Sequence, residues 1–390
     1  MKLVVVGFGQ CGGRIADEFN QLNKRARSRR GIEIVIDAFA VNTDSADLAG
    51  LQTIKADSQR RILIGAGRTH GHGVAKISEV GAEIAKEDAD KVIDAMRNTK
   101  RFFEADAFLL VAGTAGGTGS GATPVMAKVL KQRFDKPVYA LAILPFEHEE
   151  ITEERALYNT AVFLKSTYSV ADAIILVDNQ RYVRKDFSLK NNLAKINALI
   201  VEPFYNLLCA GEEKKAKHIG AKVLDAGDII NTLIGWTAIG YGKSPLPLRT
   251  LLFRRTGGFM KKSTQTHLGV QAMDEAISEL SIGCKHRDTS RALYLLSAPA
   301  RAMNIGLVKE LGEHLKHLVP EAIIRNGDYP RGKGVLDITL ILSGLSDVEK
   351  VRNYYRKSAD LVKEISKRQK VKMNKVGLTE EAGKDVPTLF

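Results

Sequence analysis

Several features that would assign the chain to a particular class are scarce or absent. Three cysteines (Cys11, Cys209 and Cys284) are too few for a disulfide framework, which favours a reducing, cytoplasmic location. No run of about eighteen apolar residues occurs, so we expect no transmembrane segment, and the first residues lack a signal-peptide pattern. The motif G-x-x-x-x-G-K-S/T is also absent, which excludes a P-loop nucleotide site.

Charge is unbalanced, since 58 basic residues against 45 acidic ones give a formal net charge of +13. A basic cluster from Lys24 to Arg30, predicted to form a solvated loop after the first helix, supplies part of this excess. The stretch from Lys363 to Lys375 supplies another part. A basic surface attracts nucleic acid or anionic lipid without a specific site. With a single tryptophan, stacking on single strands has little support, so no specific nucleic-acid partner is expected.

Buried strands alternate with helices in the first half of the 390-residue chain, whose length suits two domains. The continuous apolar runs that predict strands lie at residues 3–7, 32–44, 107–114, 138–145 and 173–179. Apolar residues at helical spacing predict one amphipathic helix over residues 80–96. Strands that are apolar on both faces and separated by helices indicate a parallel sheet covered on both sides. The sequence therefore predicts a Rossmann-like, doubly wound α/β domain.

A long helix is predicted from Leu189 to Ala210, with a bend or irregularity at Pro203. Beyond it, expected strands at 248–255, 291–300 and 334–344 alternate with expected helices at 268–282, 304–318 and 346–366. This pattern predicts a second, smaller α/β domain built on a mixed sheet. The predicted divisions are 1–185 for the nucleotide-binding domain, 186–212 for the central helix, 213–366 for the second domain and 367–390 for a tail with little apolar periodicity.

A first glycine-rich loop, GFGQCGG, follows the first strand at residues 7–13 and opens a helix. Its spacing fits G-x-G-x-x-G, in which glycines let the backbone approach a phosphate at the positive end of a helix. By itself this loop predicts a NAD-binding domain, with Asp37 or Asp44 as the acid after the second strand.

A second loop, GTAGGTGSG at residues 113–121, lies between a buried strand and a helix expected to begin near Pro124. Several consecutive amide groups and two hydroxyls at a helix N-terminus suit a polyphosphate better than the pyrophosphate of NAD. Two phosphate-binding loops on adjacent strands predict a nucleoside di- or triphosphate between them.

The segments GQCGGRI and AGTAGGTGSGATPVMA resemble the nucleotide loops of the tubulin/FtsZ family, apart from Ala115 at a position where the family has glycine. The sequence NTD after the second strand and the glycine-rich segment 62–81 also resemble FtsZ. The resemblance implies GTP or GDP, with Mg²⁺. It implies contacts from Gly9, Gln10, Cys11, Gly12, Gly13, Arg14, Asn42, Asp44, Gly113, Ala115, Gly116, Gly117, Thr118 and Gly119. His70 and His72 lack the Cys or His partners of a metal site, so none is expected.

Sugar and base contacts follow from the same resemblance. Glu149, with Glu147 as the competing choice, stands where the family places a carboxylate on the ribose. Asn179 and Asn197 match the two asparagines that read guanine, whose mixed edge an amide complements with both a donor and an acceptor. The alternatives are a turn-forming asparagine for Asn179 and a solvated helix position for Asn197.

Hydrolysis has no obvious general base in the first domain. The resemblance implies that a neighbouring subunit supplies it, from Asp225 and Asp228, although Val223 replaces the asparagine of the family motif. Two carboxylates can orient a water molecule and accept its proton. The alternative is that they cap a helix beginning near Ile229.

Taken together, the motifs are most similar to the archaeal CetZ branch of the family. That resemblance implies a polymerising GTPase that assembles head-to-tail with copies of itself and acts in cell shape. A division-ring protein like FtsZ, a non-hydrolysing GTP-binding scaffold and a NAD-dependent oxidoreductase remain as alternatives. The last residues, 385–390, resemble the start of the FtsZ adaptor-binding peptide, so an adaptor protein and a peripheral membrane contact are further expectations.

Overall fold

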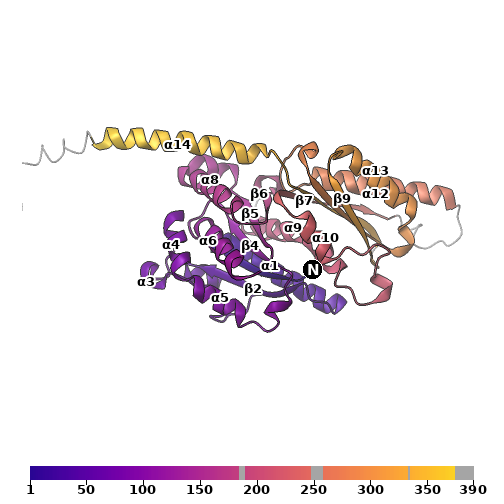
Figure 1. Ribbon diagram of the computed structural model, residues 1–390, viewed down its shortest axis with the longest axis horizontal. Coiled ribbons are helices and arrows are strands. Elements are labelled where there is room, and N and C mark those ends of the chain that lie inside the picture. The colour runs from indigo at the N-terminus through magenta and orange to yellow at the C-terminus, as the bar shows by residue number, and fades with distance from the viewer. Residues whose placement is uncertain (184–188, 247–257, 333, 374–390) are drawn as a thin grey trace, which may run out of the picture.

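The computed structural model describes residues 1–183, 189–246, 258–332 and 334–373 (Figure 1). Within these residues one ten-stranded sheet has the order β3-β2-β1-β4-β5-β6-β7-β10-β8-β9. The strands are β1 (Leu3–Phe8), β2 (Val35–Asn42), β3 (Arg61–Leu63), β4 (Ala107–Gly113), β5 (Val138–Leu144), β6 (Ala173–Asp178), β7 (Gly235–Pro245), β8 (Arg291–Ala298), β9 (Ile323–Pro330) and β10 (Val335–Ser343). The pairing is parallel from β3 through β7, whereas β10 is antiparallel to both of its neighbours. The predicted α/β fold with a parallel first part and a mixed second part is therefore confirmed.

Helices cover both faces of this sheet (Figure 1). They are α1 (Gly9–Arg30), α2 (Ser45–Ala49), α3 (Ala66–Thr69), α4 (Ser78–Glu87), α5 (Ala89–Arg97), α6 (Thr118–Arg133), α7 (Glu147–Thr152), α8 (Glu154–Tyr168), α9 (Leu189–Ala210), α10 (Ala226–Thr232), α12 (Gly258–Ser278), α13 (Ile305–Leu318) and α14 (Glu349–Met373). Side chains of β1 alternate between two cores: Val4 and Val6 face the α6 and α8 side, and Leu3 and Val5 face the α1 and α9 side. The alternation explains why these strands are apolar throughout.

Two helices differ from the sequence predictions. The single helix expected over residues 80–96 is two helices, because the chain breaks at Asp88, whose carboxylate accepts the N–H of Gly65 at 2.7 Å. The first helix continues to Arg30, so the basic cluster is helical and the loop prediction is wrong. Basic side chains in a last helical turn are favoured by the helix dipole, and Arg25 also pairs with Glu202 of α9 at 2.7 Å.

Two strands of the second half were missed by the sequence prediction. The pattern of β7 is interrupted by Gly240 and Gly242, where a Cβ would lie 2.0 Å from the carbonyl oxygens of Ala276 and Ala272 in α12. Glycine is therefore required there by close packing of a helix on the strand, although it weakens the strand signal. Strand β9 carries several polar residues, so its sequence lacks the continuous apolar run that predicts a buried strand. The strand predicted at residues 248–255 lies outside the described residues.

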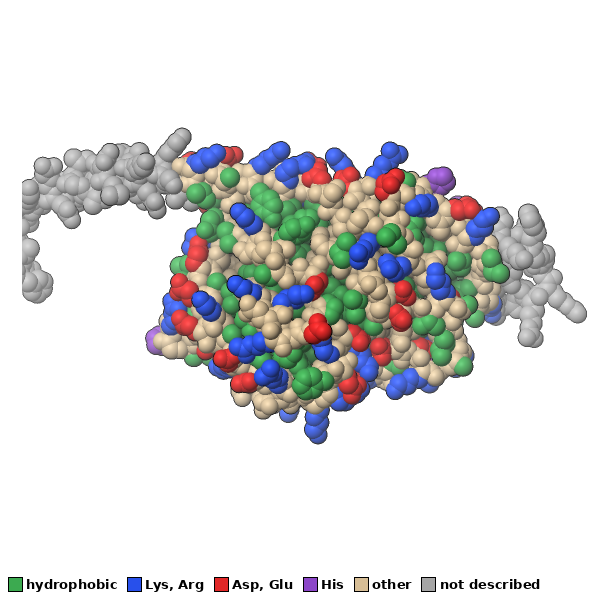
Figure 2. All heavy atoms as spheres, viewed as in Figure 1, with side chains coloured by type: hydrophobic (Ala, Val, Ile, Leu, Met, Phe, Trp, Pro, Cys, Tyr) green, Lys and Arg blue, Asp and Glu red, His purple; other side chains and the backbone are tan. Residues whose placement is uncertain are grey.

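The helix α9 runs through Pro203 as one element, and it packs on one face of the sheet against α1 and the strands of the second half. Its segment Asn192–Ala210 is long and apolar enough to cross a membrane by composition, but 61% of that window is buried inside the protein. Such burial is typical of a core helix. On the face seen in Figure 2, lysine and arginine side chains are interspersed with acidic ones and do not form a patch of one sign.

Candidate nucleotide site

The two glycine-rich loops meet at the carboxyl ends of β1 and β4. The register pairs Gly7 with Val111 and Phe8 with Ala112, so α1 and α6 begin side by side. A Cβ on Gly9 would lie 3.1 Å from the amide nitrogen of Gly119. Two helix N-termini with unpaired amide groups at one edge of a sheet form a site suited to an anion such as a polyphosphate. The second helix begins at Thr118, six residues before the predicted start at Pro124.

Several loop glycines are required by the fold itself. Gly9 has a φ of +70°, which other residues rarely adopt. A Cβ on Gly12 would lie 2.2 Å from the carbonyl oxygen of Val111, and one on Gly119 would lie 2.9 Å from that of Gly113. By contrast, a Cβ on Gly116 would meet nothing within 4 Å. The glycines therefore serve two purposes: some allow α1 and α6 to pack against the sheet, and Gly116 leaves the loop surface open.

The end of β2 is joined to both loops by side chains. Asn42 and Gln10 both donate to the carboxylate of Asp47, at 3.0 Å and 2.6 Å. The hydroxyls of Thr43 and Thr118 are 2.7 Å apart. The sequence motif NTD includes Thr43, although no contact was assigned to it. Sequence reasoning missed Asp47, although an acid three residues after the N-cap Asp44 is a recognisable helix-start signal.

A buried asparagine on α8 fixes the shape of the second loop. The Asn159 side chain donates to the carbonyl oxygens of Lys76, Ala115 and Gly116 at 2.8, 3.0 and 3.2 Å. The two N–H groups of this amide, shared among the three carbonyl oxygens, tie the loop before α6 to the segment before α4. No motif or spacing in the sequence indicates Asn159, because its partners are backbone atoms distant along the chain.

Glu149 lies near the first loop. Burial raises the pKa of the Cys11 thiol to about 12, and the nearby Glu149 carboxylate adds to the effect, so the thiol stays protonated. The Glu149 carboxylate also accepts the N–H of Phe146 at 2.9 Å, which fixes the start of α7. Glu147 is exposed on the same helix. Of the two acids, Glu149 is therefore the half-buried one beside the first loop.

The two candidate base-reading asparagines come from adjacent elements. Asn179 begins the 3-10 turn Asn179–Tyr182 directly after β6, and its Oδ1 atom is buried with no hydrogen-bond partner among the described residues. Asn197 is half-buried on α9, which contacts that turn. A buried acceptor without a donor is costly unless a ligand supplies one. The N–H groups of guanine are donors of the required kind.

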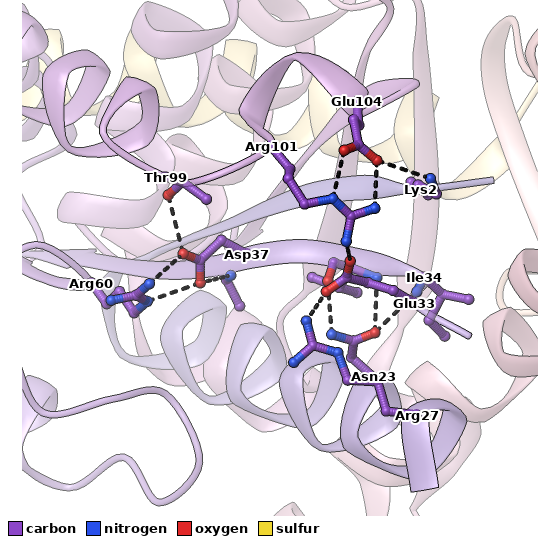
Figure 3. Close-up of polar contacts among 12 residues, drawn as sticks. Lys2, Asn23, Arg27, Glu33, Ile34, Asp37, Arg60, Thr99, Arg101 and Glu104 are labelled. Carbon is purple, nitrogen blue, oxygen red and sulfur yellow. Dashed lines mark hydrogen bonds and ion pairs between the residues drawn. The ribbon is translucent and has the colours of Figure 1, made fainter. Parts of the chain in front are cut away.

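Asp37, the alternative acid for a NAD site, lies in the amino half of β2 and is already paired. Figure 3 shows it between Arg60 and Thr99: Arg60 Nη2 is 2.9 Å from its Oδ2 atom, and Thr99 donates to the same oxygen at 3.1 Å. Its strand neighbour is Val4, whereas Val41 lies beside Phe8 at the loop end. Asp37 is therefore remote from the phosphate loops and does not fit a ribose contact.

Asp225 and Asp228 lie at the other end of the sheet. Asp225 is exposed and caps α10, which begins at Ala226 rather than near Ile229, by accepting the N–H of Asp228 at 2.9 Å. The helix leads directly into β7, whose Gly235 aligns with Ala173, the first residue of β6. The aspartates thus lie by the amino ends of the parallel strands and the glycine loops by the carboxyl ends. A six-residue strand separates such ends by roughly 20 Å, so one chain does not bring the two sets together.

The described residues contain no group of three or more His, Cys, Asp or Glu side chains arranged to hold a metal ion. The sheet is mostly parallel, and its carboxyl edge carries two helix N-termini and the unpaired side-chain amide oxygen of Asn179. Together these features define a nucleotide-binding protein of the doubly wound class.

Comparison with known proteins narrows this class. The GTPase-domain model of the Tubulin/FtsZ family matches residues 2–185, and the model of the C-terminal domain of tubulin-like CetZ proteins matches residues 186–360. The tubulin-like protein CetZ1 of Haloferax volcanii is 34% identical over 368 residues, which cover 90% of each chain.

Two solved structures from the same organism are also similar. CetZ1 as a GDP-bound monomer has a TM-score of 0.78 and 31% identity, covering 92% of this chain and 99% of that one. CetZ2 in a GTPγS-bound protofilament has a TM-score of 0.80 and 28% identity, covering 94% and 100%. The chain therefore belongs to the Tubulin/FtsZ family, and its second half carries the C-terminal domain of the CetZ proteins. The resemblance inferred from the two loops is confirmed.

Proposed function

We propose that the chain is a polymerising GTPase of the cytoskeleton, which binds GTP at the carboxyl end of the sheet and hydrolyses it at the junction between successive copies. The observation that carries the proposal is the separation of the glycine loops from Asp225 and Asp228 by the length of the parallel strands. A head-to-tail contact would bring the acids of one copy to the nucleotide of the next. The GTPγS-bound protofilament of the CetZ2 relative supports such an assembly, and a heterologous contact that does not close gives a filament.

Each part of the nucleotide has a group suited to it. The N-termini of α1 and α6, with Thr118, would hold the phosphates, Glu149 the ribose, and Asn179 with Asn197 the guanine. Mg²⁺ commonly binds through substrate phosphates with few protein ligands, and it would neutralise phosphoryl charge here. The GDP and GTPγS in the structures of CetZ relatives support GTP and GDP as ligands.

In the reaction, Asp225 would accept a proton from the attacking water, with Asp228 helping to orient that water. A positioned general base contributes typically about 10²–10⁴-fold. Asp228 also lies 3.6 Å from Arg325 Nε of β9, which limits the repulsion between its carboxylate and a phosphate. Asp225 acts as helix cap and candidate base together, so the two interpretations made from sequence are compatible.

The wider role follows from the same proposal. We assign residues 1–185 to GTP binding, 186–212 to the central helix, 213–366 to assembly and 367–390 to a tail. We propose a cytoplasmic role in cell shape rather than in a division ring. The match of the second half of the chain to the CetZ C-terminal domain supports its placement in that branch of the family. The adaptor-binding peptide proposed at residues 385–390, and with it any peripheral membrane contact, lies outside the described residues.

A mixing experiment tests the shared site. Asp225→Asn keeps the helix cap, since asparagine caps as well as aspartate, but removes the base. Gly116→Asp places a carboxylate in the phosphate loop at a position where a Cβ meets nothing within 4 Å. Each variant alone should release almost no phosphate from GTP. Mixed in equal amounts, they should recover activity, because a junction can combine the intact loop of one copy with the intact acid of the other.

Phosphate release by the unmodified chain should also rise more steeply than linearly with protein concentration. Light scattering and electron microscopy with GTP and Mg²⁺ report the polymer. A mixture as inactive as its components, although each variant enters filaments with unmodified chain, would contradict the shared site. A GTP-retaining polymer of unmodified chain with no phosphate release would instead favour a scaffold.

A further inference from the structure

The helix α14 follows β10, in the second half of the chain, and packs along α8 of the first half (Figure 1). Its first turns border a cleft of about 590 Å³ that also includes residues of α7 and the end of β6. Helix α7 carries the candidate ribose residue Glu149, and the end of β6 directly precedes the candidate base reader Asn179. The start of α14 therefore lies next to both the ribose-facing helix α7 and the turn that carries Asn179.

Lys350, in the first turn of α14, contacts an acid on each of these segments. Its ammonium nitrogen is 2.7 Å from Oδ1 of Asp178, at the end of β6, and 3.7 Å from Oε1 of Glu150 on α7. The exposed fractions of the two acidic side chains are 13% and 11%, and that of Lys350 is 24%. Charges this far from solvent are screened weakly, so Lys350 links two segments whose acids would otherwise repel one another.

The contact with Asp178 reaches the base reader through one further hydrogen bond. The same Oδ1 atom accepts the N–H of Gln180 at 3.1 Å and so caps the turn that Asn179 begins. The second half of the chain supports the turn elsewhere too, since Arg181 donates to the carbonyl oxygens of Ser278 and Leu280 at 2.6 Å each. The direction of the unpaired Asn179 amide oxygen thus depends on a carboxylate that Lys350 holds.

The contact with Glu150 acts on the ribose side. The hydroxyl of Tyr354, one turn after Lys350 on α14, donates to Glu150. Burial and the Glu150 carboxylate raise the pKa of Tyr354, so the phenol keeps the proton that it donates. Because Glu150 directly follows Glu149 in α7, fixing one also fixes the backbone of the other.

We propose that Lys350 is a positioning residue for nucleotide recognition, which holds the base-reading turn and the ribose-facing helix in register from the second half of the chain. The inference rests on the proposed GTP site. It makes guanine selectivity, as well as affinity, depend on the position of α14. Binding of a guanine nucleotide and docking of α14 then support each other.

The test compares Lys350→Met, which keeps most of the side-chain length without the charge, with Lys350→Arg. Lys357→Met is the matched control on the same helix, because Lys357 is 60% exposed and lies 3.9 Å from Glu150.

Two quantities are measured for each variant. The first is the pair of dissociation constants for GTP and for ITP, which lacks the 2-amino group of guanine, and the second is the urea-unfolding midpoint. Lys350→Met should weaken GTP binding by about tenfold, the equivalent of one lost charge-assisted hydrogen bond. It should also reduce the preference for GTP over ITP, while Lys350→Arg restores both and Lys357→Met changes neither.

A purely structural role would lower the unfolding midpoint of Lys350→Met and leave its GTP-to-ITP preference unchanged, which would overturn the proposal. If Lys350→Met fails to fold, Asp178→Asn takes its place, since it keeps the cap of the turn and removes the charge that Lys350 holds. Asn179→Ala separates the two hypotheses. A loss of preference in Asn179→Ala without one in Lys350→Met refutes the inference alone, whereas no loss in Asn179→Ala refutes the proposed base contact beneath it.

Discussion

The two ends of the parallel sheet are built in different ways. At the carboxyl end, helix starts and loops are packed so closely that Gly12 and Gly119 cannot carry a Cβ without displacing backbone. At the amino end, Asp225 is exposed, and Val223 beside it has 43% of its surface accessible. A ligand site enclosed by one chain needs its groups held within the core. A group contributed to another copy must instead stand on the surface, and the acids occupy such a position.

The supports of the two ends also differ. The carboxyl-end loops are held by the sheet and by buried polar groups such as Asn159. The amino-end segment is held from β9, where the carboxylate of Asp328 accepts the N–H groups of Ala221 and Lys222 at 3.0 Å and 2.6 Å. Changes at the first end should therefore impair folding and binding together, whereas changes at the second should impair hydrolysis and leave binding intact.

The largest effect is expected from Gly12→Ala. The added methyl group would lie 2.2 Å from the carbonyl oxygen of Val111, so α1 must move away from β4. Overpacking of this kind costs about 1–3 kcal/mol, and moving the start of α1 should also weaken GTP binding. Urea unfolding and nucleotide titration measure the two effects.

The matched control for that change is Gly116→Ala in the same binding region, where a Cβ meets nothing within 4 Å. Its stability should stay within about 0.5 kcal/mol of the unmodified chain. Equal destabilisation by the two alanines would show that the close packing around Gly12 does not explain the cost of its substitution.

Sequence reasoning located the carboxyl end well because its signals are local. Two glycine loops after apolar strands can be recognised without knowing which strands are neighbours, and α9 was predicted with its observed ends, Leu189 and Ala210. Strand β7 was missed because Gly240 and Gly242 are required by a helix packed from elsewhere in the chain. The break at Asp88 coincides with a contact between its carboxylate and the N–H of Gly65, a residue distant along the chain.

In the candidate site too, residues with a local sequence pattern could be predicted, whereas residues that act through contacts distant along the chain could not. Asp225 and Asp228 were chosen by resemblance, and the cap that they form could be expected from their spacing. Asn159 and Lys350 leave no trace in the sequence, because each acts on segments that only the fold brings near. Such supporting residues can be recognised only in the folded structure.

A smaller effect is expected from Asp328→Ala at the amino end. It removes the acceptor of two backbone N–H groups in the segment that leads to Asp225. We expect a loss of about 1–2 kcal/mol in stability, since both groups regain water in part. Phosphate release should fall while the dissociation constant for GTP stays unchanged. Asp328→Asn retains an amide oxygen and should recover part of the loss. Weaker GTP binding in Asp328→Ala would show that the two ends are not independent.

The smallest effect is expected in the pH dependence of stability, and it comes from His218 in the segment that precedes Asp225. Burial and the nearby Arg30 lower the pKa of His218 below its ordinary value of 6.5, although its ring contacts the carbonyl oxygen of Pro330 at 3.2 Å. Between the folded-state pKa and pH 6.5, the unfolded chain therefore binds a proton that the folded chain does not. The stabilisation is complete above pH 6.5 and is lost as pH falls toward the folded-state pKa.

His218→Gln should thus flatten the decline of the urea midpoint between about pH 7.5 and about pH 5.5. His148→Gln, at an exposed position on α7 near the other end, should leave the decline as it is. If His218→Gln and His148→Gln flatten the decline equally, the pH dependence does not arise from His218 in the amino-end segment.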